Sequence, residues 1–184
     1  MATTKTKVLN LSSFGEDVKK ALQLAESLQE IGSTHGFNVF QPGAMKELKM
    51  AAILGHNWIL SKKNADACSR EDSNEVYEYL SGTEDGAGQI DRVFKDDPAD
   101  AEQHEKYLQS MERIERNKAF YLAYTNSNTS RPLDILRIYE VTPAAIREET
   151  DRQLQNSTNK ISHVSFNENF ARAKGRLIWP KKKF

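Results

Sequence analysis

Residues 64–81 read N-A-D-A-C-S-R-E-D-S-N-E-V-Y-E-Y-L-S, and the candidate site of this chain is expected within them. Two short alternating runs flank the polar, turn-rich pentad R-E-D-S-N at 70–74, a pattern typical of a β-hairpin. Side chains along a strand point to opposite faces in turn. Pairing of the two strands is therefore expected to bring the carboxylates of Asp66 and Glu78 together.

Two carboxylates held close together repel each other unless a proton or a cation lies between them. Oxygen ligands on rigid strands suit Mg²⁺, which proteins hold with one or two carboxylates, waters and a substrate phosphate. The hairpin therefore predicts a metal site for phosphodiester chemistry. From the spacing alone, an alternative stays open, in which this is a surface hairpin with two solvated acids.

The composition is that of a globular protein, with 184 residues of which 38% are hydrophobic. We expect one domain over 1–184, with flexible ends at 1–11 and 181–184. Because 26 basic residues balance 26 acidic ones, a nucleic-acid partner would need locally segregated charge. The single cysteine, Cys68, excludes an internal disulfide and fits a cytoplasmic protein. No apolar run has the length of a membrane span, so no membrane partner is expected.

The order of predicted elements indicates an α+β or mixed α/β fold with a central mixed sheet flanked by helices. The run K-A-F-Y-L-A-Y-T at 118–125 is almost continuously apolar, which predicts a strand buried on both faces. The apolar stripe of the first helix fits either a dimer interface or packing on its own domain. The expected helices are 12–32, 42–55, 97–116, 142–154 and 168–174, and the expected strands outside the hairpin are 57–61, 118–125, 134–141, 161–166 and 176–179.

Polar residues on both sides of the hairpin are candidate DNA contacts. Lys62 and Lys63 precede it, where they form either a solvated edge or contacts to a phosphate backbone. The stretch 82–88 has three glycines and predicts a flexible loop, without the Gly-Lys-Ser/Thr of a P-loop. Gln89, Asp91 and Arg92 follow; Gln and Arg suit the reading of base edges, although isolated residues of this kind are commonly plain surface.

The order of Asp66 and Glu78 resembles the PD-(D/E)XK nuclease motif. The stretch 35–55, H-G-F-N-V-F-Q-P-G-A-M-K-E-L-K-M-A-A-I-L-G, is similar to the region before the active site in PvuII-type type II restriction endonucleases. N-A-D-A resembles that family's aspartate strand and V-Y-E-Y-L-S its glutamate strand. The resemblance covers roughly residues 30–155 in order and is specific over 35–81.

This resemblance implies a restriction-endonuclease-like core and a Mg²⁺-dependent endonuclease that cuts double-stranded DNA at a short specific sequence. Asp66 and Glu78 would be the Mg²⁺ ligands, with the main-chain carbonyl of Tyr79 as a further one. The family further implies a homodimer that straddles the duplex and cuts both strands with a metal-activated water.

The chain departs from the family at three places. Leu80 stands where the motif has a lysine, Pro42 stands where the family has an acid, and the family's base-reading histidine pair has no counterpart after Ser81. The missing charge has three explanations: another cation replaces it, a neutral group such as Gln89 positions the water, or the chain binds DNA without cutting it. The candidate replacements are Lys62, Lys63, Arg92 and Lys95.

We carry forward the first explanation. The expected catalytic residues are then Asp66, Glu78, Gln89 and Lys63, and the expected DNA contacts are Lys62, Lys63, Gln89, Asp91 and Arg92, with the segment 156–163 as a further candidate. Two other functions stay open: a catalytically silent DNA-binding relative of the nuclease fold, and a protein-interaction domain in which the hairpin is only structural.

Overall fold

The structure is a computed structural model that describes residues 15–41, 43–60, 65–127 and 133–180. Its contacts divide the chain into two compact units, one ending at Ala44 and the other beginning at Met45. In the first unit, helix α1 (Gly15–Thr34) is followed by a turn in which Phe37 and Val39 are buried. Gly32 permits this turn, because a Cβ there would lie 2.7 Å from the carbonyl oxygen of Phe37.

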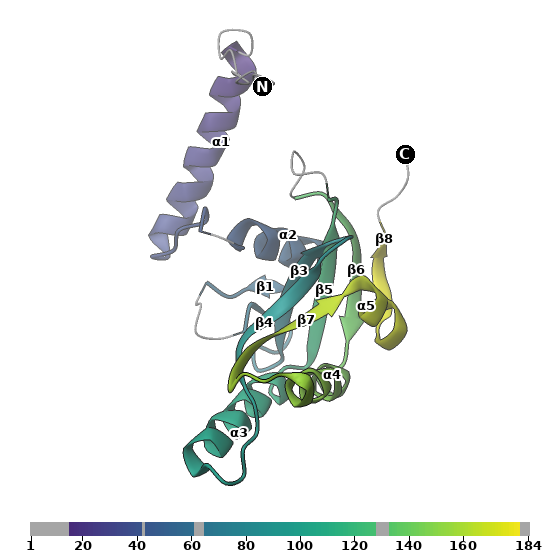
Figure 1. Cartoon of the computed structure of the whole chain (residues 1–184). Coiled ribbons are helices and arrows are strands. Elements are labelled where there is room, and N and C mark those ends of the chain that lie inside the picture. The colour runs from purple at the N-terminus through teal and green to yellow at the C-terminus, as the bar shows by residue number, and fades with distance from the viewer. Residues whose placement is uncertain (1–14, 42, 61–64, 128–132, 181–184) are drawn as a thin grey trace, which may run out of the picture. The chain divides into compact units, whose positions relative to one another are not determined.

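The second unit is built on a six-stranded mixed sheet with the order β1-β2-β3-β5-β6-β8 (Figure 1). The β3–β5 pair is parallel, and the other four pairs are antiparallel. The expected α+β class with a mixed central sheet is therefore confirmed. The strands are β1 (Asn57–Trp58), β2 (Ala67–Cys68), β3 (Val76–Thr83), β5 (Ala119–Thr125), β6 (Ile135–Val141) and β8 (Arg176–Pro180).

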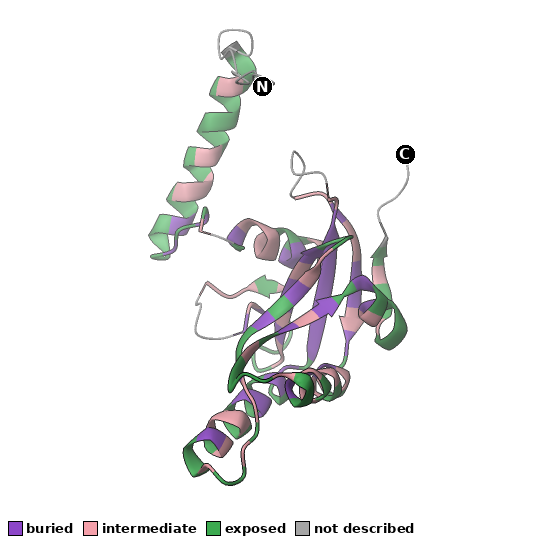
Figure 2. Cartoon of the chain, in the orientation of Figure 1, coloured by how far each residue is buried: buried purple, intermediate pink, exposed green. Residues whose placement is uncertain are grey.

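A hydrophobic core lies on each face of this sheet. Strand β5 is buried along its whole length, as its apolar run predicts, and Figure 2 shows it in the buried colour. Because strand side chains alternate, Leu80 and Leu122 belong to one core while Tyr79 and Tyr121 belong to the other. Glu78, which alternates with Tyr79, shares the face of Leu80.

The first core is covered by a two-stranded ribbon, β4 (Ala87–Phe94) and β7 (Ile161–Asn167), and by helices α3 (Ala101–Glu115), α4 (Pro143–Asn156) and α5 (Glu168–Lys174). Helix α2 (Ala44–Leu54) contributes Met50 and Ala51 to the second core. Helix α4 begins where the sequence predicts, and Thr142 caps it, because its Oγ1 accepts the N–H of Ala145 at 3.3 Å. No described helix is long and apolar enough to cross a membrane.

The expected flexible loop after Ser81 is wrong as a structural prediction. Its first residues continue β3, and residues from Ala87 on form β4. Two of its glycines are required for close strand contact: a Cβ on Gly82 would lie 2.6 Å from the carbonyl carbon of Ala87, and one on Gly88 would lie 2.9 Å from Cβ of Leu80. The glycines therefore let β4 cross β3 closely, and only a tight turn joins the two strands.

Candidate functional site

Main-chain contacts hold Asp66 between two strands. Asp66 lies one residue before β2, its N–H donates to the carbonyl of Tyr77 at 3.1 Å, and its carbonyl accepts the N–H of Ile59 at 2.9 Å. Its carboxylate accepts the amide N–H of Tyr79 at Oδ2, over 2.8 Å. The hairpin therefore fixes this carboxylate against β3.

Glu78 lies in β3, next to the residue whose amide binds Asp66, and it is half-buried. Burial, together with the negative charge of Asp66, raises the pKa of Glu78 from 4.5 to about 8. The protonated form of this carboxyl group is therefore favoured at neutral pH. The predicted pairing of the two acids is present, and a cation that displaced the proton would restore charge balance.

Leu80, which stands at the lysine position of the motif, is only 5% exposed and packs in the first core with Ile90 and Val93. The alternation of β3 places it on the same face as Glu78, as the motif requires, but over hydrophobic groups. A lysine here would bury an ammonium group among apolar side chains. This position therefore supplies no charge to the site.

Positive charge reaches Glu78 instead from the end of α3. Arg113 and Arg116 both lower the pKa of Glu78, against the effect of burial. Arg113 Nη2 donates to the carbonyl of Asp91 at 2.9 Å, and the N–H of Lys118 donates to the carbonyl of Val76 at 2.8 Å, which brings the end of α3 to the start of β3. In the sequence, the many charges of this helix face are typical of a solvated surface, and no local signal marks the two arginines.

A third acid, Glu47 of α2, was also missed. Its negative charge contributes to the raised pKa of Glu78, and Trp58 Nε1 donates to its Oε2 at 3.4 Å. Among the described residues, His, Cys, Asp and Glu side chains form no group of three or more that could hold a metal ion. The candidate metal ligands are therefore the pair Asp66 and Glu78, a number of carboxylates with which Mg²⁺ is commonly held.

The other predicted site residues lie apart from this pair or outside the described residues. Gln89 is exposed on β4 and donates to Ser165 Oγ at 3.1 Å, on the side of the ribbon opposite to Gly88 and Ile90. The structure thus does not bring Gln89 to the two acids. Asp91 is exposed and lies 2.6 Å from Nδ1 of His163. Lys62, Lys63 and Pro42 lie outside the described residues.

Two of the proposed substitutes for the lysine can be placed. Lys95 Nζ donates to the carbonyl of Ser157 at 2.7 Å, so its ammonium group serves the connection after α4. Arg92 is exposed and lies with Arg113 at a surface depression beside α3. Of the two placed substitutes, Arg92 is therefore the one that lines a depression together with Arg113, whose charge lowers the pKa of Glu78.

On the opposite face of β3, the ring of His56 packs against the rings of Tyr77, Tyr79 and Tyr121. Its Nδ1 lies 2.8 Å from the hydroxyl of Tyr79, and its ring stacks on Tyr77 with centroids 4.2 Å apart. Burial and, to a smaller extent, the charge of Arg70 lower the pKa of His56. The neutral ring is therefore favoured, and Tyr79 is fixed through its hydroxyl on one face and through its amide at Asp66.

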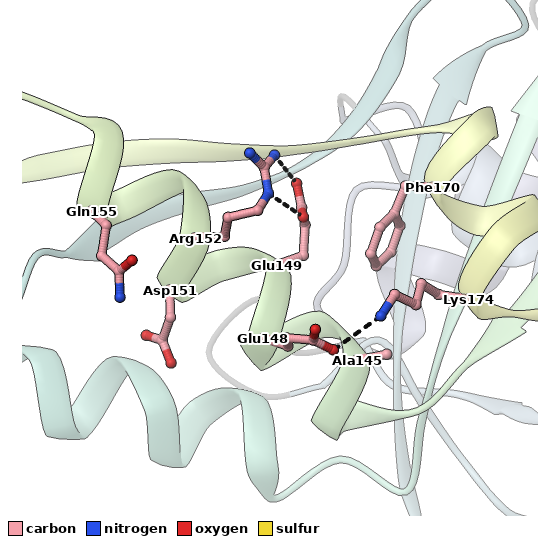
Figure 3. Close-up of a pocket in the computed structure, with 8 residues that line it drawn as sticks. All are labelled: Ala145, Glu148, Glu149, Asp151, Arg152, Gln155, Phe170 and Lys174. Atoms are coloured by element: carbon pink, nitrogen blue, oxygen red, sulfur yellow. Dashed lines mark hydrogen bonds and ion pairs between the residues drawn. The ribbon is translucent and has the colours of Figure 1, made fainter.

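A separate surface depression of about 350 Å³ lies between α4 and α5 (Figure 3). Its charged side chains are largely paired with each other: Arg152 Nη2 lies 2.6 Å from Glu149 and Lys174 Nζ lies 3.1 Å from Glu148. None of its lining residues belongs to the candidate site. This depression therefore gives no support to chemistry at Asp66 and Glu78.

No protein-family model matches this chain, and a comparison with curated proteins finds no match.

Proposed function

We propose that this protein is a Mg²⁺-dependent endonuclease of the PD-(D/E)XK type, which hydrolyses phosphodiester bonds of double-stranded DNA at a short specific sequence, as type II restriction endonucleases do. The observation that carries the proposal is the acidic pair: the Asp66 carboxylate is bound to the Tyr79 amide at 2.8 Å, beside Glu78 in the same strand. The two acids follow the order of the motif, with Asp66 one residue before β2 and Glu78 in β3, the strand that pairs with β2.

The residues present fit a divalent cation. Both donors are hard carboxylate oxygens, and Glu78 holds a proton at neutral pH that a cation can replace. Asp66 and Glu78 would hold the metal, and the carbonyl of Tyr79 is a further proposed ligand. When bound, Mg²⁺ supplies a water of lowered pKa and neutralises charge on the scissile phosphate. The Tyr79 amide orients the Asp66 carboxylate for this task.

The positive charge that the motif takes from its lysine is assigned here to the end of α3. Arg113 is held by the carbonyl of Asp91, and the charges of Arg113 and Arg116 act on Glu78. An arginine cannot give up its proton at neutral pH, so these groups stabilise negative charge on the DNA backbone near the metal site and do not serve as a base. The homodimer that the resemblance implies is retained in the proposal, because α1 leaves the large apolar side chains of Leu22, Leu24 and Ile31 exposed.

The test is cleavage of mixed-sequence plasmid or phage DNA by the full chain, in Mg²⁺ and in EDTA, followed on a gel. Discrete fragments that form only in Mg²⁺ are the expected result, and mapping of their ends gives the recognition site. Fragments that form equally in EDTA contradict the proposal.

A second function is favoured by one observation. Leu80 is buried in the first core at the position of the motif's lysine. A relative of the nuclease fold that has lost its catalytic lysine and binds DNA without cutting it would show the same buried apolar residue at this position. Uncut DNA that is nevertheless retarded on a gel selects this silent binder. DNA that is neither cut nor retarded at low salt selects a protein-interaction domain instead.

A further inference from the structure

We propose that the surface depression between the bulge of β4 and helix α3 binds backbone phosphates of DNA; this inference rests on the proposed function. The depression measures about 280 Å³. Its lining includes three cationic side chains and no acidic one, and consists of Arg92, Phe94, Lys106, Gln109, Ser110 and Arg113. Phosphate groups are the ligands that such a cluster favours.

Arg92 lies in a strained backbone conformation that points to a function. Its φ is 54°, in the left-handed region that glycine adopts without cost and arginine does not. It lies at the irregularity between Ile90 and Val93 in the pairing of β4 with β7. Such bulges redirect a side chain, and here the redirected side chain lines the depression. Glycine would fit this backbone better, so the arginine side chain itself is the part that a function would require.

Arg113 is prepared for a phosphate by the fold. One guanidinium nitrogen, Nη2, donates to the carbonyl of Asp91 at 2.9 Å, while the side chain as a whole stays exposed. The planar guanidinium group matches two oxygens of a phosphate, and a fixed group loses little freedom on binding.

The floor of the depression is held by contacts within the protein. Ser110 Oγ donates to the carbonyl of Lys106 at 2.8 Å and accepts the N–H of Phe94 at 3.3 Å. Lys106 Nζ lies 5.8 Å from the centre of the Phe94 ring and is paired with Glu102. The charge of Lys106 is therefore partly compensated, and the guanidinium groups of Arg92 and Arg113 are the main phosphate ligands.

The position of the depression favours a DNA backbone over a free phosphate. Arg113 lies in the last turn of α3, and just after this helix the N–H of Lys118 donates to the carbonyl of Val76 in β3, the strand that carries Glu78, so the depression lies at the end of α3 that meets this strand. A DNA strand that places one phosphate at Asp66 and Glu78 carries further phosphates along its length, and Arg92 and Arg113 are placed to bind one of them. Such contacts add affinity without reading the sequence.

The experiment is fluorescence anisotropy of a labelled DNA duplex with the full chain in EDTA, over a series of salt concentrations. Arg92→Ala and Arg113→Ala are each expected to lower affinity by about 3- to 10-fold at 0.1 M salt, and to reduce the slope of log K against log salt by about one. Arg152→Ala removes an arginine paired with Glu149 in the other depression and should change neither quantity.

Arg92→Gly separates the binding role from folding. Glycine relieves the strain at φ 54°, so this variant is expected to melt at a higher temperature and still to bind DNA about as weakly as Arg92→Ala. A melting temperature that rises together with unchanged DNA affinity overturns the inference.

Three further outcomes distinguish the source of the phosphate and the fate of the proposed function. If Arg92→Ala abolishes stabilisation by inorganic phosphate but leaves DNA binding unchanged, the site takes a free phosphate and the inference is wrong. If wild type cuts DNA while both arginine variants bind DNA with the same salt dependence as wild type, only the inference fails. If wild type binds through these arginines but never cuts, only the endonuclease proposal fails.

Discussion

Replacing Glu78 by glutamine should remove a pH-dependent loss of stability from the protein. Below pH 4.5 the Glu78 carboxyl group is protonated in both the folded and the unfolded chain. Between pH 4.5 and about 8 the folded chain keeps a proton that the unfolded chain releases, so stability falls as the pH rises. Above pH 8 both states are ionised and the loss is complete.

The magnitude follows from the pKa of the folded state. One pKa unit corresponds to about 1.4 kcal/mol, so the rise from 4.5 to about 8 costs about 5 kcal/mol at pH 8.5 and about 3 kcal/mol at pH 7. Glutamine has nearly the same shape and does not titrate. The difference in unfolding free energy between Glu78→Gln and wild type should therefore grow from near zero at pH 4.5 to about 5 kcal/mol at pH 8.5.

The assay is urea unfolding at half-unit pH steps between 4.5 and 8.5, in EDTA. Glu71→Gln, which changes an exposed acid in the turn of the same hairpin, is the control and should follow wild type throughout. Asp66→Asn removes a charge that raises the pKa of Glu78 and should give an intermediate curve. Parallel curves for wild type and Glu78→Gln would refute the conclusion that Glu78 is a buried, protonated acid.

Three other predictions concern the metal, the framework and self-association. At pH 7, Mg²⁺ at 100 times its Kd should stabilise wild type by about 2.7 kcal/mol and release close to one proton, by calorimetry in two buffers, and Glu78→Gln should show neither effect. Glu168→Gln should lower the free energy of unfolding by about 3 kcal/mol at pH 7, measured by urea unfolding, because Arg137, Arg172 and Tyr139 lower the pKa of Glu168 to about 2. This contribution to stability is present above pH 4.5 and is lost as the pH falls towards 2. A decrease in unfolding free energy of less than 0.5 kcal/mol would contradict this prediction. Light scattering should give twice the chain mass of 20.9 kDa for wild type and for the control Lys20→Glu. The double variant Leu24→Glu with Ile31→Glu should be a monomer, because these two exposed side chains lie two turns apart on one face of α1. A monomeric wild type would contradict the homodimer.

Features encoded by neighbouring residues could be predicted from the sequence. The alternating runs and turn pentad of 64–81 predict the hairpin, and the apolar run at 118–125 predicts the buried strand β5. The cap of α4 at Thr142 follows in the same way. These signals are local, because turn, strand and cap preferences depend on residues close together in the chain.

Features that depend on distant contacts could not be predicted in this way. Gly82 and Gly88 resemble a flexible loop in the sequence, but they are strand residues that allow β3 and β4 to cross, which only the packing reveals. Arg113 and Arg116 occupy an ordinary charged helix face, and they act on Glu78 because α3 ends where β3 begins. Glu47 likewise reaches the site only through the placement of α2. The approach of Asp66 to Glu78 could thus be predicted from the hairpin, whereas the arginines and the third acid near Glu78 could not, and the predicted Gln89 lies away from the two acids.

The central claim is that Asp66 and Glu78 form the Mg²⁺ site of a DNA endonuclease. The most direct test measures the single-turnover cleavage rates of Asp66→Asn and Glu78→Gln on a mapped DNA site in Mg²⁺. Each variant should cut at least about 100-fold more slowly than wild type, because it removes a metal ligand, while Glu71→Gln keeps the wild-type rate. Cleavage by both variants at the wild-type rate would contradict the claim and place the chemistry elsewhere on the protein.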